Sequence, residues 1–118
     1  MKPKLYGRRC IGLSRTANEH ANIQRQVEVL RQFASNEGMI FVGAVRLIGV
    51  GGNDTEKHID DLIKRKVEDD DFDVLVLTDR SRLSRGGSNH GEWLLGRLRE
   101  AGIEVAFAAE AGAPISSS

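Results

Sequence analysis

Short apolar runs alternate with segments of helical periodicity along this chain, and that alternation restricts its fold more than any other feature. The apolar runs are "CIGLS", "MIFVGAVRLI", "FDVLVL" and "IEVAFAA", each followed by polar or glycine-rich residues, which is typical of buried strands. Between them, apolar residues recur at helical spacing. Alternating strands and helices favour a parallel sheet with right-handed crossovers. We therefore predict an α/β domain with a central, mostly parallel sheet and helices on both faces.

Capping residues set the predicted helix boundaries. The first helix covers residues 22–37, with Asn22 as its N-cap and Gly38 as its stop. The second begins at the "DT" of "GGNDT" and ends before "EDDD", and the third is "GEWLLGRLREAG". Open parallel sheets bind ligands beyond the carboxyl ends of their strands. Ser14, the "GVGG" loop and the arginines after "DVLVL" all fall at such ends.

Length and composition narrow the class of protein. A chain of 118 residues suits one domain, and a formal net charge of zero argues against a stand-alone nucleic-acid binder of the strongly basic kind. The single cysteine, Cys10, cannot form an internal disulfide, and the chain has no CxxC pair for zinc. No apolar stretch approaches the roughly 20 residues that span a bilayer, and the first residues lack a secretory signal. We expect a soluble, cytoplasmic protein without membrane contact.

The remaining polar and aromatic candidates favour ordinary structural roles. The acidic stretch "EDDDFD" has no interleaved His or Cys ligands, so we interpret it as a solvated loop rather than a metal site. His20, His58 and His90 have no metal-ligand spacing and are expected on the surface. Trp93 is spaced as a core residue or a subunit contact rather than a base-stacking platform.

The stretch "LTDRSRLSRGG" is the clearest candidate for chemistry. It places Arg80, Arg82 and Arg85 directly after the apolar run "DVLVL". Guanidinium groups stay charged at any working pH and offer bidentate donors that suit phosphate or carboxylate oxygens. An anion site is one interpretation, and a polar turn whose arginines pair with nearby acids is the other. This stretch alone leaves both open.

Several motifs together resemble the N-terminal catalytic domain of the serine recombinases, the resolvase and invertase group with its large phage-integrase relatives. "CIGLS" stands where that family has Tyr-x-Arg-x-Ser, which implies Ser14 as the nucleophile. "NIQRQVEVLRQFASNEGM" is similar to the Ser-Leu-x-x-Gln helix and puts Gln26 at the glutamine position. "SRLSR" resembles Asp-Arg-Leu-x-Arg, the most specific of these motifs, and implies phosphate-binding roles for Arg82 and Arg85. "EKHIDDLI" puts Lys57 at an arginine position.

The resemblance implies site-specific DNA recombination through a 5′-phosphoserine intermediate, with no cofactor and no metal. Arg15, Gln26 and Arg80 would support phosphate binding. DNA is the implied partner, and the full-length protein would associate with itself as a dimer or tetramer. The resemblance also implies a resolvase-like catalytic domain over residues 1–110, with 111–118 as a tail or truncation point before the family's dimer helix.

Four departures from the family pattern bear on activity. Gly12 occupies the place of the first catalytic arginine, and Lys57 keeps a charge but loses bidentate geometry. Ser81 replaces the usual aspartate, and Gly51 replaces the loop serine. Arg15, on the far side of Ser14, is a candidate to compensate for the missing charge. The alternative to an enzyme is a non-catalytic interaction or regulatory module that keeps the recombinase fold.

Overall fold

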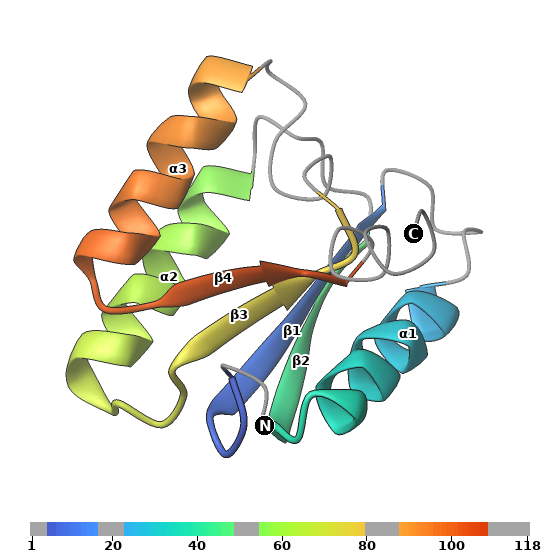
Figure 1. Cartoon of the computed structure of the whole chain (residues 1–118). Coiled ribbons are helices and arrows are strands. Elements are labelled where there is room, and N and C mark those ends of the chain that lie inside the picture. The colour runs from blue at the N-terminus through green and yellow to red at the C-terminus, as the bar shows by residue number, and fades with distance from the viewer. Residues whose placement is uncertain (1–4, 17–22, 49–54, 80–87, 109–118) are drawn as a thin grey trace.

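The computed structural model describes residues 5–16, 23–48, 55–79 and 88–108, and strands and helices alternate along them as the sequence predicts (Figure 1). The elements in chain order are β1 (Arg9–Thr16), α1 (Ile23–Asn36), β2 (Ile40–Ile48), α2 (Thr55–Glu68), β3 (Val74–Leu77), α3 (Ser88–Glu100) and β4 (Glu104–Phe107).

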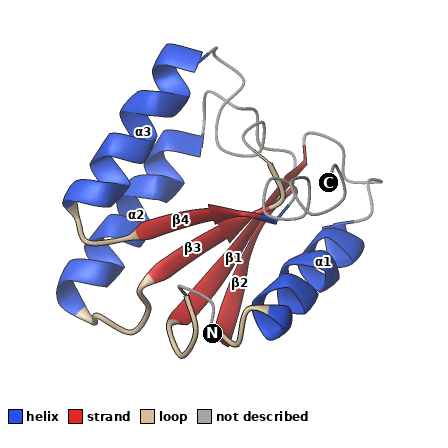
Figure 2. Ribbon diagram, in the orientation of Figure 1, coloured by secondary structure: helices blue, strands red, loops and turns tan. Residues whose placement is uncertain are grey.

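The described strands form one sheet with the order β2-β1-β3-β4, and every neighbouring pair is parallel. Helix α1 covers one face of this sheet, and α2 and α3 lie together on the other (Figure 2). The predicted three-layer α/β architecture is confirmed. Because all strands are parallel, their carboxyl ends meet at a single edge of the sheet.

Two apolar clusters fill the space on the two sides of the sheet. Alternate residues of β1 divide between them: Ile11 and Leu13 pack under α2 and α3, whereas Cys10 packs under α1 beside Leu30. The four residues of β3 are all buried because helices cover both of its faces. This division fixes which side chains of β1 can meet in a site.

Some element boundaries differ from the prediction. Helix α3 begins at Ser88, three residues before the predicted start, and α1 agrees with the predicted 22–37 to within one residue at each end. Strand β1 continues to Thr16, so Ser14 lies inside the strand rather than at its last position. The extension has a physical cause, because β2 pairs with β1 as far as Ile48 and gives the polar residues after Ser14 a hydrogen-bonded partner.

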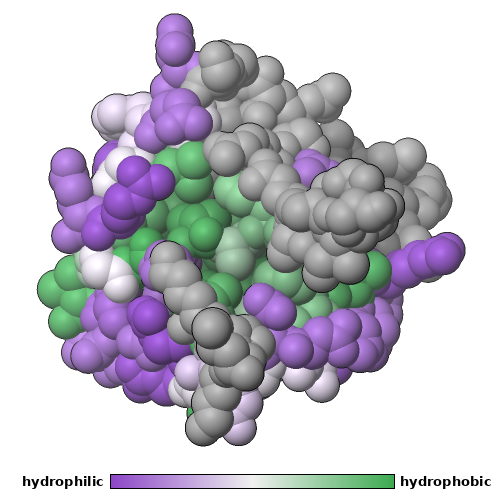
Figure 3. Space-filling model, in the orientation of Figure 1, coloured by the Kyte–Doolittle hydropathy of each residue, from purple (hydrophilic) through white to green (hydrophobic). Residues whose placement is uncertain are grey.

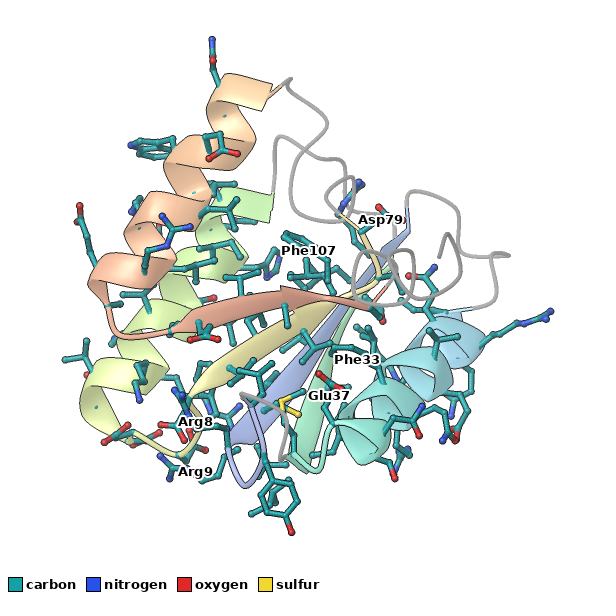
Figure 4. All side chains as sticks on the ribbon, in the orientation of Figure 1. Arg8, Arg9, Phe33, Glu37, Asp79 and Phe107 are labelled. Carbon is teal, nitrogen blue, oxygen red and sulfur yellow. The ribbon has the colours of Figure 1, made fainter. Side chains whose placement is uncertain are left out.

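The acidic stretch between α2 and β3 is ion-paired as well as solvated, which corrects the simpler expectation. Arg9 donates from Nε and Nη2 to the Asp73 carboxylate at 3.0 and 3.1 Å, and Lys66 Nζ donates to the same carboxylate at 3.1 Å. Arg65 pairs in the same way with Asp71. Arg9 lies at the amino-terminal edge of the sheet in Figure 4, and Asp79 at the opposite edge. The acidic stretch therefore stabilises the amino-terminal edge of the sheet, which is the edge opposite the candidate site.

The face seen in Figure 3 carries apolar surface around β4 and toward α3, with hydrophilic residues about it. Strand β4 is an edge strand of the described sheet, and three of its four residues are only partly buried. On α3, Trp93 is 49% exposed, stacks on His90 and lies under the Arg97 guanidinium. Trp93 is therefore not a core residue, and a subunit contact there stays a prediction.

Candidate functional site

Ser14 combines complete burial with an unpaired hydroxyl. Its exposed fraction is 0%, and Oγ has no hydrogen-bond partner among the residues that the structure describes. Leaving a buried polar group unpaired costs free energy, and such groups are few in native proteins. The Ser14 hydroxyl therefore has a hydrogen-bonding capacity that the described fold does not use.

Gln26 lies at the level of Ser14 along the same face of the sheet. Gly7 N donates a hydrogen bond to Gly38 O at 2.8 Å. The start of β1 therefore lies beside the end of α1, and the helix runs antiparallel to the strand. A Cβ at Gly12 would lie 3.0 Å from Leu30 Cδ1, and this fixes where the two elements face each other. Ser14 is two residues after Gly12 on the strand, and Gln26 is four residues before Leu30 on the antiparallel helix. Both steps cover about 6–7 Å in the same direction, so Ser14 and Gln26 lie at the same level.

Gln26 shares the unsatisfied state of Ser14. Its Oε1 atom is buried and accepts no hydrogen bond within the described part of the chain. These are two unpaired polar atoms, from β1 and α1, at the same level of the same sheet face. Both atoms can therefore take a further hydrogen bond.

The space beside Gly12 is closed by apolar atoms. Besides Leu30, the ring of Phe41 would lie 3.2 and 3.3 Å from a Cβ at this position. These separations are tighter than ordinary van der Waals contact. A larger side chain at Gly12 would have to displace the Leu30 side chain or the Phe41 ring.

Arg15 leaves β1 on the face opposite Ser14, because successive strand residues alternate. Its exposed fraction is 3%, and its register partner Leu47 belongs to the apolar cluster under α2 and α3. Lys57 is exposed on α2, the helix that covers that same opposite face. Ser14 and Gln26 are thus on the α1 side of the sheet, whereas the Arg15 side chain and helix α2 with Lys57 are on the other side.

The arginine-rich motif falls outside the described residues. Arg80, Arg82 and Arg85, with Ser81, lie in residues 80–87, and Gly51 lies in 49–54. Their predicted roles stay predictions. The described chain resumes at Ser88 and ends before 80–87 at Asp79, which lies by the carboxyl end of β3 (Figure 4).

The Cys10 thiol is poorly suited to act as a nucleophile. Burial raises the pKa of its thiol to about 11, so the thiol stays protonated near neutral pH. Among the described residues, no three His, Cys, Asp or Glu side chains gather closely enough to hold a metal ion. No helix in this described part is long and apolar enough to cross a membrane.

Comparison with known proteins decides the family. The model of the family described as "Resolvase, N terminal domain" matches residues 10–117. The chain belongs to the resolvase N-terminal domain family. No curated protein matches this chain.

Two solved structures show that the resolvase-family fold extends over most of the chain. The N-terminal catalytic domain of TP901-1 integrase is 20% identical with a TM-score of 0.73, over 86% of this chain and 78% of that one. The C-terminal catalytic domain of ISC1926 TnpA, an IS607-like serine recombinase, is 24% identical with a TM-score of 0.71, over 85% of this chain and 68% of that one. At these identities the likeness shows the fold alone.

Sequence reasoning did not find one charged residue that the structure places beside Ser14, namely Arg46. Ser14 of β1 is the register partner of Arg46 of β2, and partners in a parallel pair present their side chains on the same face. Arg46 is exposed, and no described residue holds its side chain by a hydrogen bond or ion pair. A bulge in β2, opposite Cys10 and Ile11, shifts the register between the two strands. Simple alternation along β2 therefore does not predict that Arg46 and Ser14 share a face.

Proposed function

We propose that this chain, over residues 1–110, is the catalytic domain of a site-specific DNA recombinase with Ser14 as its nucleophile. The observation that carries the proposal is the buried, unpaired Ser14 hydroxyl in a domain of the resolvase family. Such a hydroxyl lowers the stability of the fold, so its presence is better explained by chemistry than by folding.

The proposed reaction needs no external energy source. Ser14 Oγ attacks the phosphorus of a DNA phosphodiester and forms a 5′-phosphoserine bond, while the bond from phosphorus to the 3′ oxygen breaks. The serine proton ends on the released 3′ hydroxyl. A 3′ hydroxyl from the partner DNA then attacks the phosphoserine, which restores a phosphodiester and frees Ser14. One ester bond replaces another at each step.

Positive charge supplies most of the catalysis in phosphoryl transfer, because negative charge gathers on the oxygens around phosphorus. In this proposal Arg82 and Arg85 bind the scissile phosphate, and Arg80 and Lys57 add positive charge. Gln26 positions the phosphate from α1. Strand exchange joins two duplexes, so DNA and further copies of the protein are the proposed partners.

A non-catalytic role is the second candidate, and the packing around Gly12 favours it. The family's first catalytic arginine would stand there, but Leu30 and Phe41 fill the space. In that case the domain would keep the recombinase fold for interaction or regulation. The two candidates differ in whether a covalent link between Ser14 and DNA ever forms.

A covalent adduct tests the proposal. The full-length protein is incubated with labelled duplex fragments of the DNA that flanks its gene, and protein-linked label is detected on a denaturing gel. We expect an adduct that Ser14→Ala abolishes and that Ser35→Ala, an exposed serine on α1, leaves unchanged. Because Ser14 Oγ has no described partner, Ser14→Ala should fold at least as stably as the natural chain. An adduct that persists in Ser14→Ala would remove Ser14 from the mechanism.

A further inference from the structure

We propose that Arg46 is a further phosphate-binding residue of this site and supplies positive charge beside Ser14. The inference rests on the proposed function, since it concerns the same phosphodiester. It begins from two groups at one register position: a buried hydroxyl on β1 and an exposed guanidinium on β2, neither with a hydrogen-bond or ion-pair partner among the described residues.

The strand register carries the geometry. Neighbouring strands lie about 4.8 Å apart, a distance shorter than an extended arginine side chain. Ser14 and Arg46 are register partners in a parallel pair, so both side chains leave on the same face. The Arg46 side chain is therefore long enough to reach an anion held at Ser14 Oγ.

Packing on both faces of β2 confirms which face Arg46 occupies. Gly12 faces α1, because its Cβ direction meets Leu30, and its register partner on β2 is Ala44. Arg46 follows two residues later and shares that face. The intervening Val45 packs against the apolar cluster under α2 and α3. Arg46 is thus on the α1 side, with Ser14 and Gln26.

The Arg46 side chain has no hydrogen bond or ion pair within the described residues, whereas several other arginines near the sheet are held. Arg9 and Arg65 each hold an aspartate, and Arg97 is paired with Asp60. Arg15 is buried on the opposite face. An exposed arginine that no described acid holds can bind a phosphate without first breaking an ion pair in this part of the chain. Arg46 also lies on an edge strand, where a DNA backbone has access.

The closed space at Gly12 favours a phosphate-binding side chain at some other position of the sheet. With apolar atoms around Gly12, positive charge cannot enter from that position of β1 without repacking. Arg46 is on the neighbouring strand, two register positions further toward the carboxyl edge of the sheet. It would approach the phosphate from the side of β2, whereas the motif arginines follow β3 on the other side of β1.

A phosphodiester titration tests this inference without requiring cleavage. Dimethyl phosphate is added to the isotope-labelled 118-residue chain, and the NMR signals of the Ser14 amide and the Arg46 side-chain Nε–H are followed. We expect both to shift together with one dissociation constant. Arg46→Ala should weaken binding about tenfold, as loss of one charged hydrogen bond does. Arg46→Lys should restore part of it. Arg99→Ala, an exposed arginine on α3, should change nothing.

The outcomes separate this inference from the proposed function. Equal affinity of Arg46→Ala and Arg99→Ala, or a Ser14 amide that does not respond to dimethyl phosphate, overturns the role of Arg46. In the DNA assay, Arg46→Ala should reduce adduct formation about 10²- to 10³-fold. Adduct formation at the natural rate in Arg46→Ala would reject the inference and leave the recombinase function standing. Arg46-dependent binding of dimethyl phosphate by a protein that forms no adduct would support the inference and reject the catalytic function.

Discussion

At the scale of single residues, the atoms around Gly12 make a sharp prediction about stability. Leu30 and Phe41 leave a Cβ at this position 3.0–3.3 Å from its neighbours, whereas a Cβ at Gly43 would meet nothing within 4 Å. We expect Gly12→Ala to lower the free energy of unfolding by about 1–3 kcal/mol relative to Gly43→Ala, because the core would be overpacked. Urea denaturation of both variants measures the difference. Equal stability of the two variants would show that the Leu30 and Phe41 side chains can move aside at little cost in free energy.

The same packing changes how a missing charge at Gly12 should be tested. Restoring an arginine by Gly12→Arg would also force the Phe41 ring aside, so a loss of activity would have two causes. A smaller residue in place of Phe41 has to accompany the arginine. Arg46 is a cleaner position for a charge experiment, because its side chain is exposed and unpaired within the described residues.

At the scale of elements, α3 contains two glycines that packing does not require. A Cβ at Gly91 or Gly96 would meet nothing within 4 Å, and neither has a positive φ. Glycine inside a helix costs about 0.5–1 kcal/mol relative to alanine. We expect Gly96→Ala to raise the free energy of unfolding by about that amount. Gly102→Ala, in the turn directly after this helix, is the control: the φ of +86° at Gly102 disfavours any Cβ, so stability should fall. Thermal unfolding of the two variants in opposite directions is the expected result.

The helices and strands are the part of the structure that the sequence predicts best. The alternation of apolar runs and helical stripes predicts all seven described elements and their parallel order, because each pattern reports local burial. The pairing of Ser14 with Arg46 could not be predicted. Strict alternation from Phe41, which packs under α1, would place Val45 and Leu47 on that face. The bulge opposite Cys10 and Ile11 moves Arg46 there instead, and only tertiary packing reveals a bulge.

At the scale of the whole molecule, a network of charges joins three elements at the sheet edge away from the site. Asp73 accepts hydrogen bonds from Arg9 of β1 and Lys66 of α2, and its backbone N and O bond to Arg9 O and Glu104 N. The side-chain hydrogen bond from Arg9, with help from Lys66, holds the pKa of Asp73 well below its ordinary value of 3.8. Asp73 is therefore the residue through which acid should act on the fold.

The sign of that pH dependence follows from proton binding. Because the pKa of Asp73 is lower in the folded protein, the unfolded chain binds more protons in acid. The stability that Asp73 contributes is present above the ordinary pKa and is lost as the pH falls from about 5 to about 2. Asp73→Asn should be less stable than the natural chain at pH 6 by about 1–2 kcal/mol and should lose less stability between pH 6 and pH 3.

The control is Asp71→Asn, because the Asp71 carboxylate is more exposed and pairs with Arg65. This variant should keep most of the natural slope of stability against pH. Urea unfolding at both pH values measures these slopes, and an unchanged slope in Asp73→Asn would mean that other carboxylates govern the acid stability of the domain.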